Sequence, residues 1–452
     1  MYFISKKKFL RYFFTIKDLK LRQIFSRLLR LFYKPRFKLI SHNSFLNIKS
    51  RLDYSPNYRI KLENNKLEFQ GASHSINEPF ALNNDLTNLY KYKFHYLEFI
   101  FSNSLEGTKY IRNYINIFKN DNIANEPYPV SKRLLNLIIF LLKNPESIDK
   151  NLQDYIFSLG VHLKKNIEYW VDGNHLLSNY IAIVMWNALF SSNISSKEED
   201  KYKRKLISTL NEQFNFDGSH YERSLMYQIE ITSDLISLQK FLDFLKTSED
   251  LIIELDKIIN NSLAFISLMS HKNGDPVCFN DSIHDIHLRD FYDYVELNGY
   301  NISTKENAKK LKDFFVSSSN KYKIFIDLSS VSPKSIPGHS HAQAASFEIS
   351  NDNNVIFNNG GISTYENNQI REFERSSKNH NSMTIDDQNS CDTWGSFRVS
   401  RKYKTSTQTL QQGNEKFVKI NHSGFSTFAK KNHIREFRLK HNSIEVLDFY
   451  KS

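Results

Sequence analysis

The chain has 452 residues, of which 40% are apolar and 14% aromatic, so it is long enough for two or three globular domains and too apolar for a disordered protein. Its formal net charge is +12, but residues 1–40 hold twelve Lys or Arg and one acid, so 12 − 1 = +11 of this charge belongs to the N-terminal arm. The rest of the chain is nearly neutral, and we therefore expect no nucleic-acid partner. Cys278 and Cys391 are the only cysteines and lie far apart, which excludes a disulfide framework and a cysteine-based zinc module.

The N-terminal arm, residues 1–40, alternates bases with aromatic and aliphatic residues. Leu28, Leu31 and Phe32 can share one helical side, with Arg27 and Arg30 elsewhere. This pattern predicts a basic amphipathic helix that docks on its own domain, which we favour, or makes peripheral contact with an anionic membrane surface. No apolar run reaches transmembrane length, and charges interrupt any signal-peptide core.

Residues 85–315 show helical periodicity, with Leu and Ile recurring three and four positions apart. The clearest segments are RLLNLIIFLLKN (133–144), LQDYIFSLGVHLKKNIEYW (152–170), YKRKLISTLNEQF (202–214) and EITSDLISLQKFLDFLK (230–246). Short polar connectors separate them, which is typical of helix hairpins in bundles, solenoids or α/α toroids.

One helix in this region has an unusual beginning. The segment GNHLLSNYIAIVMWNALF (173–190) is apolar on nearly every face, which predicts a helix buried on both sides. It nevertheless opens on Asn174 and His175, with Ser178 one turn later. Taken alone, this polar start is explained as a helix cap.

Near residue 320 the period changes from 3.6 to 2. Short alternating segments follow, separated by Gly, Asn, Asp or Ser: KYKIFIDLSS, AASFEISN, NVIFN, NSMTIDD, EKFVKIN and NSIEVLDFY. This is a strand-and-turn pattern typical of an antiparallel sandwich. We therefore predict an α-then-β organisation with a boundary at 318/319, and a sandwich that is incomplete at residue 452.

Four clusters of polar residues are candidates for chemistry. They are Asn174-His175; the segment 217–231 with His220, Glu222, Arg223 and Tyr227; the pair His339-x-His341; and the segment 358–387 with Tyr365, Arg371, Arg375, His380 and Asn381. Each alone has a structural explanation, and the joint set is what indicates a site. Few carboxylates occur among them, which argues against chemistry by an acid pair.

These motifs carry a resemblance to a known family. EPYPVSKRLLNLI (126–138), GNHLLSNY, DGSHYERSLMYQ, FNDS (279–282), GHSHAQAASFEIS, GGISTY, RSSKNHNSMTIDD and WGSFRVSRK (394–402) occur in order over some 330 residues. In these motifs the chain resembles the heparinase II/III family of polysaccharide lyases, most closely members associated with bacterial capsule or O-antigen clusters. The resemblance implies an α+β multidomain protein: an arm (1–40), an incomplete α/α toroid (41–318) and an antiparallel β-sandwich (319–452), with a cleft between the last two.

The resemblance also implies a reaction and roles for individual residues. The reaction is β-elimination at a uronic acid of an anionic polysaccharide, and it needs no cofactor. Asn174 matches the residue that neutralises the uronate carboxylate, His175 a general base, and His339 a histidine that helps hold the carboxylate. Tyr227 matches the acid that serves the leaving oxygen and also the base for one C5 stereochemistry. A tyrosine needs a cationic neighbour to lower its pKa before it acts as a base.

Further residues are assigned through the same resemblance. The residues that would contact sugar or flank the cleft are His220, Glu222, Tyr365, Arg371 and Arg375. Those that match a structural zinc site are His341, Asn358 and His380. Asn358 stands where an aspartate is expected, and an amide is a poorer zinc ligand than a carboxylate.

Departures from the family pattern keep other functions open. Ser178 stands where an acid is common, Gln343 replaces an acid after the His-x-His pair, and Ser224–Gln228 replaces Ser-Pro-x-Tyr-His. They leave as alternative a non-catalytic glycan-binding protein of surface polysaccharide assembly. A third reading is a glycoside hydrolase using Asp217, Glu222 or Asp281. The family resemblance favours the cell envelope or periplasm, while the lack of a clear signal peptide leaves a cytoplasmic or membrane-peripheral location open.

Overall fold

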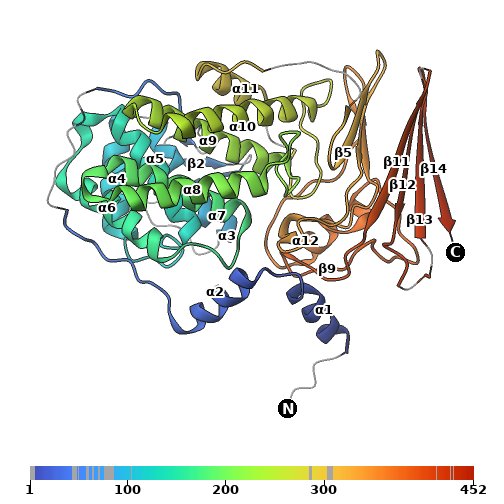
Figure 1. The fold of residues 1–452 in the computed structure, drawn as a ribbon, viewed down its shortest axis with the longest axis horizontal. Coiled ribbons are helices and arrows are strands. Elements are labelled where there is room, and N and C mark those ends of the chain that lie inside the picture. The colour runs from blue at the N-terminus through green and yellow to red at the C-terminus, as the bar shows by residue number, and fades with distance from the viewer. Residues whose placement is uncertain are drawn as a thin grey trace.

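The computed structural model divides into a helical domain, a β-sandwich and an N-terminal arm that touches both (Figure 1). The structure describes residues 6–42, 48, 50–57, 61–63, 66–69, 72–75, 86–102, 104–284, 288–302, 309–413, 415–427, 429–430 and 432–451.

The helical domain contains nine of the described α-helices and a small sheet. The helices are α3 (Asn88–Phe94), α4 (Ser104–Phe118), α5 (Pro127–Lys143), α6 (Lys150–Lys165), α7 (Gly173–Leu189), α8 (Ser196–Gln213), α9 (Leu225–Leu245), α10 (Glu249–Leu268) and α11 (Leu288–Leu297). The sheet has the order β1 (Lys61–Glu63), β2 (Lys66–Phe69) and β3 (Ala72–Ser75). Short 3₁₀ turns are η1 (Glu98–Phe101), η2 (Pro145–Ser147) and η3 (Ser191–Asn193).

Three helices form the centre of this domain because their sequences are apolar on every side. In α5 every residue from Pro127 to Leu142 is buried, and α7 and α9 are buried over most of their lengths. α7 packs on α5, α8 and α9, so the apolar part of 173–190 holds the start of α7 in a fixed place. The predicted buried helix is thus confirmed. The incomplete toroidal arrangement of the helices stays a prediction.

The sandwich consists of two antiparallel sheets packed face to face. The first has the order β4 (Lys309–Lys310), β5 (Phe314–Ser318), β6 (Lys323–Asp327), β7 (Phe347–Ser350) and β8 (Val355–Phe357). The second has the order β11 (Thr405–Gln412), β12 (Glu415–His422), β13 (Asn432–Leu439) and β14 (Ile444–Lys451). η4 (Pro337–His339) lies in the connection from β6 to β7. The connection from β8 to β11 contains α12 (Gln369–Glu374), η5 (Ser377–Asn379), β9 (Thr393–Trp394) and β10 (Arg398–Val399).

Alternation of apolar and polar residues accounts for this packing. Along β13 buried and half-buried residues alternate strictly, and Phe437 meets Phe347 of the opposite sheet in one apolar core. The α-then-β fold class is confirmed. β4 and β5 pair with each other and β5 pairs with β6, so the first sheet begins by Lys309 and the predicted boundary at 318 falls inside it.

The N-terminal arm forms α1 (Lys6–Ile16) and α2 (Leu21–Phe32), which lie along one edge of both domains (Figure 1). Arg11 makes an ion pair with Asp392 of the sandwich side at 2.7 Å. Arg22 makes one with Asp172 of the helical domain, also at 2.7 Å. The arm therefore docks on its own protein and connects the two domains. Among the described helices, none combines the length and apolarity needed to cross a bilayer.

Candidate active site

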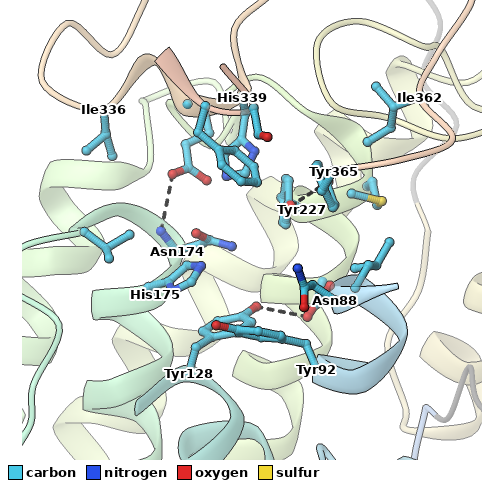
Figure 2. Close-up of a pocket in the computed structure, with 18 of the residues that line it drawn as sticks. Asn88, Tyr92, Tyr128, Asn174, His175, Tyr227, Ile336, His339, Ile362 and Tyr365 are labelled. Carbon is cyan, nitrogen blue, oxygen red and sulfur yellow. Dashed lines mark hydrogen bonds between the residues drawn. The ribbon is translucent and has the colours of Figure 1, made fainter. Parts of the chain in front are cut away.

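A cleft of about 1780 Å³ is lined by residues of the helical domain, the sandwich and the arm. Figure 2 shows part of its lining. Pockets for small molecules commonly measure roughly 300–1,000 Å³, so this cleft has room for several sugar residues of a polymer. Its Phe, Tyr and Trp lining residues, whose flat faces suit sugar rings, are Tyr92, Tyr96, Tyr128, Trp170, Tyr227, Phe291, Tyr365 and Phe397.

Asn174 enters the cleft from the first turn of α7. Asp172 caps this helix, since its carboxylate accepts a hydrogen bond from the Gly173 amide at 3.0 Å. Gly173 has φ +62°, and a Cβ there would come within 2.2 Å of Glu222 Oε1, so the tight turn requires glycine. The Asn174 side-chain nitrogen is buried and has no hydrogen-bond partner among the described residues. A buried donor without a partner is costly, and a bound acceptor would satisfy it.

His175 is the next residue on the cleft wall. Its Nδ1 lies 3.1 Å from Glu168 Oε2, and its ring stacks on Tyr128 with 4.1 Å between centroids. Burial alone would lower the pKa of His175, but the charge and hydrogen bond of Glu168, together with the charges of Glu222 and Glu126, outweigh it and raise the pKa. Glu168 therefore both orients the ring and sets its proton affinity.

Tyr227 faces His175 from across the cleft, on the first turn of α9 (Figure 2). Ser224 caps α9 by accepting a hydrogen bond from the Tyr227 amide at 3.3 Å. The Tyr227 hydroxyl lies 2.7 Å from the Tyr365 hydroxyl, and its ring lies against His339 at 4.3 Å. Burial, together with Tyr365 and Asp281, raises the pKa of Tyr227 well above its usual value. The phenol is therefore protonated in the free protein and is placed to donate a proton.

Asp281 holds the sandwich side of the site together from behind the cleft. Its carboxylate accepts hydrogen bonds from His339 Nδ1 at 2.8 Å, from His341 Nε2 at 2.7 Å and from Arg371 at 2.6 and 2.9 Å. Burial would raise the pKa of Asp281, but Arg371 and the two histidines outweigh it and lower the pKa well below its usual value. This ionised carboxylate orients His339 so that its other ring nitrogen, Nε2, is the one available to a ligand.

The structure separates the predicted sugar-binding residues into two groups. Glu222 and Tyr365 line the cleft, and burial raises the pKa of both. Three others lie behind its wall: His220 Nε2 donates to Gln213 Oε1, Arg371 binds Asp281, and Arg375 donates to the carbonyls of Gly395 and Ser340. These three side chains are no more than 1% exposed.

His220, Arg371 and Arg375 are predicted to contact sugar or flank the cleft. Direct contact with sugar does not fit their buried positions, whereas Arg371 flanks the cleft by packing on Tyr365 and Phe397. Burial lowers the pKa of His220 to about 3 and that of Arg375 to about 10, so His220 is neutral at pH 7. The guanidinium groups of both arginines instead donate hydrogen bonds to acceptors inside the protein. We expect them to act on the site by holding its walls.

The predicted zinc ligands do not assemble as a set of three. His341 Nδ1 lies 3.0 Å from His380 Nε2, and burial lowers the pKa of these residues to about 3 and about 4. Asn358 is exposed, whereas the next residue, Asn359, is buried and accepts a hydrogen bond from Ser346 at 2.6 Å. No cluster of three or more His, Cys, Asp or Glu side chains suited to a metal occurs in the described part of the chain. A zinc site built on Asn358 is therefore not supported.

Some functional residues lie outside the sequence predictions. Glu168 occupies a connector after α6 without any motif to mark it. The acid missing at Ser178 has a counterpart on α9: the Ser178 hydroxyl lies 3.5 Å from Asp234 Oδ2, and Lys132 binds the same carboxylate at 2.6 Å. Negative charge near this position thus comes from a neighbouring helix, beyond the reach of a local motif.

The cleft lining contains more acidic side chains than Lys and Arg side chains. The acidic lining residues are Glu126, Asp172, Glu222, Glu230, Asp290 and Glu366, and the Lys and Arg side chains are Arg27, Lys93 and Arg398. Several are already paired, for example Lys93 with Glu230 at 3.3 Å. The described cleft therefore does not offer a broad cationic surface to a heavily charged polymer.

A helical domain followed by an antiparallel β-sandwich, with a cleft between them, is the architecture that the resemblance to polysaccharide lyases implies. The model of the heparinase II/III N-terminus matches residues 74–302, and the heparinase II/III-like C-terminal model matches residues 308–450. The chain belongs to the heparinase II/III-like family.

Solved structures share this fold. The chain is similar to a structure described as heparinase III, with 16% identity, a TM-score of 0.65 and coverage of 94% of this chain and 75% of that one. It is also similar to heparan sulfate lyase HepC from Pedobacter heparinus, with 13% identity, a TM-score of 0.55 and coverage of 98% and 73%. At these identities the likeness shows the fold alone. No curated protein sequence matches significantly.

Proposed function

We propose that this protein is a polysaccharide lyase that cleaves a uronate-containing glycan by β-elimination. The observation that carries the proposal is the buried, unpartnered Asn174 amide beside His175, facing the proton-bearing Tyr227 and His339 across one cleft (Figure 2). A carboxylate bound at Asn174 and His339 would satisfy the amide and bring the uronate C5 proton to this point.

The residues supply each proton transfer of the elimination. The uronate carboxylate makes its C5 proton hard to remove, and hydrogen bonds from Asn174 and His339 lower that barrier by stabilising the enolate-like intermediate. His175 in its neutral form takes the C5 proton. The C4–O4 bond breaks, a C4=C5 double bond forms, and the Tyr227 hydroxyl gives its proton to the departing oxygen. Tyr365, at 2.7 Å, is placed to return a proton to Tyr227.

The cleft charges further support a substrate of low charge density. Because acidic lining residues outnumber Lys and Arg, a glycan with one carboxylate on some sugars suits the cleft better than a densely sulfated one. Each uronate would be neutralised locally at Asn174 and His339.

The test is a turnover assay with unsulfated uronate polysaccharides. Lyase action leaves an unsaturated sugar end that absorbs ultraviolet light, and His175→Ala should abolish the increase in absorbance. Folded protein that binds the glycan but gives no absorbance, with or without His175, would instead support the non-catalytic glycan-binding alternative, which Gln343 and Ser178 motivate.

The hydrolase alternative has less support. Among Asp217, Glu222 and Asp281 only Glu222 lines the cleft. Asp217 binds Ser219 at 2.7 Å, and Asp281 is fully occupied by two histidines and Arg371. A hydrolase needs two carboxyl groups on either side of the bond, which these positions do not provide.

A further inference from the structure

Helix α2 docks on the protein through its polar side. Its one buried residue is Gln23, whose side-chain amide donates to the carbonyls of Val171 at 3.2 Å and Ser335 at 3.4 Å. The arginines of α2 also point toward the helical domain. Arg22 donates to Asp172, Arg27 to the Trp170 carbonyl and Arg30 to the Asn166 side chain. A surface helix ordinarily buries its apolar side, so this orientation is reversed.

The apolar side of α2 therefore faces water. Leu21, Phe25, Leu28 and Phe32 are 85%, 64%, 54% and 89% exposed, and their spacing of four, three and four residues places them on one stripe. α1 repeats the pattern with Phe9, Phe13 and Ile16, all at least half exposed. More than half of the exposed large apolar side chains of the described residues lie in this arm. A clustered apolar surface of this kind marks an interaction face, unlike single exposed residues.

Exposed basic residues follow both helices in the chain. Lys17, Lys34, Arg36 and Lys38 are exposed, and residues 1–40 carry a net charge of +11. A second copy of the chain would bring an equal positive charge to the contact, and the two arms would repel. Apolar and aromatic side chains in a strongly basic segment match the interface of a bilayer that contains anionic lipid.

We propose that α1 and α2 bind the surface of an anionic membrane, with their apolar stripes among the lipid headgroups. The arm also contributes Thr15, Leu19 and Arg27 to the cleft lining. A protein bound in this way holds one end of its cleft beside the lipid surface. This proposal concerns a different face from the catalytic one and does not depend on turnover.

The test is co-sedimentation of the full chain with vesicles of phosphatidylglycerol and phosphatidylcholine, compared with vesicles of phosphatidylcholine alone. We expect binding to the anionic vesicles that weakens with salt. The double variant Leu28→Glu/Phe32→Glu should lower the vesicle partition coefficient by about tenfold or more, because it places two charges in the apolar stripe. Both positions are exposed, so the fold should persist, which circular dichroism can verify.

Two matched variants act as controls. Phe216→Glu/Ile253→Glu changes side chains that are 84% and 67% exposed on the helical domain, and it should bind vesicles as the wild type does. Lys34→Glu/Lys38→Glu should lose binding, whereas Lys197→Glu/Lys257→Glu, with the same change in net charge, should keep most of it. Absence of wild-type binding, or equal binding by the Leu28→Glu/Phe32→Glu variant, overturns the proposal. So does a wild-type dimer that the same variant converts to a monomer in light scattering, because a second copy would then cover the face.

Discussion

Arg371 binds Asp281 through two parallel hydrogen bonds of 2.6 and 2.9 Å, and the same carboxylate holds His339 and His341. Arg371 and Asp281 are both almost completely removed from water. The pair thus joins α12 to His339 on the cleft wall and to the buried His341 behind it. A buried charge is stable only with its partner, so the network is sensitive to the loss of any member.

Asp281→Asn should destabilise the protein by about 3–5 kcal/mol, because it leaves the Arg371 guanidinium buried without a counter-charge. The pKa of Asp281 is lowered in the folded state, so its contribution is present at neutral pH, and it declines only as pH falls below the usual aspartate range towards the folded pKa. Urea unfolding at pH 7 measures the loss. Asp387→Asn, which removes a surface partner of Lys378, should leave the midpoint unchanged. A midpoint for Asp281→Asn equal to that of the wild type would contradict the role of the network.

The pH dependence of turnover should report the His175–Glu168 pair. His175 acts as a base only when neutral, and its pKa is raised, so kcat/KM should increase with pH through a pKa above the usual histidine value. Glu168→Gln removes the largest favourable charge, so the pKa should fall and the rising limb should move to lower pH.

A pH–rate profile of both proteins measures this shift. Glu198→Gln, which removes a partner of Lys164 far from the cleft lining, serves as the control and should keep the wild-type profile. A Glu168→Gln profile with an unmoved rising limb would mean that another group acts as the base.

The fold was predictable because it depends on local periodicity. The change from a 3.6-residue to a 2-residue period near 320 reflects the change from helices to sheets, and the apolar faces of 173–190 reflect the central position of α7. Ordinary helix and strand patterning specifies such features without knowledge of distant contacts. The error at the 318 boundary arose because FFVSS is too short to show alternation clearly.

The catalytic candidates were identified by motif, but their supporting residues were not. Glu168 and Asp234 approach the α7 end from other segments, and only the packed structure brings them there. The zinc prediction failed at one residue because Asn358 faces solvent while Asn359 faces the interior. Sequence spacing also did not show that Arg371 and Arg375 face inward, since two arginines four apart normally lie on an exposed helix face.

Tyr227→Phe should lower kcat by about a thousandfold while glycan binding changes little, because the phenyl ring keeps its packing against His339 but has no proton to give. Tyr292→Phe is the control. It removes a hydroxyl that lies 2.9 Å from the Ser270 hydroxyl, neither residue lines the cleft, and the variant should keep full activity. Ultraviolet product formation gives kcat, and calorimetric titration of the inactive variant gives affinity. If Tyr227→Phe turned over at the wild-type rate, another group would have to be the acid, and Tyr365, whose hydroxyl lies 2.7 Å from that of Tyr227, would be the first candidate.

Substrate charge should decide which glycans are cleaved. The cleft lining contains more acidic than Lys or Arg side chains, so an unsulfated uronate polymer should have a kcat/KM about tenfold or more above that of a heavily sulfated polymer of equal length. Glu366→Gln and Asp290→Asn remove lining charges without touching Asn174, His175 or Tyr227, so they should raise kcat/KM for the sulfated polymer and affect the unsulfated one little. Both rates are measured by ultraviolet absorbance at fixed ionic strength, because salt screens the effect. Faster cleavage of the sulfated polymer by the wild type would show that its sulfates meet cations other than Arg27, Lys93 and Arg398.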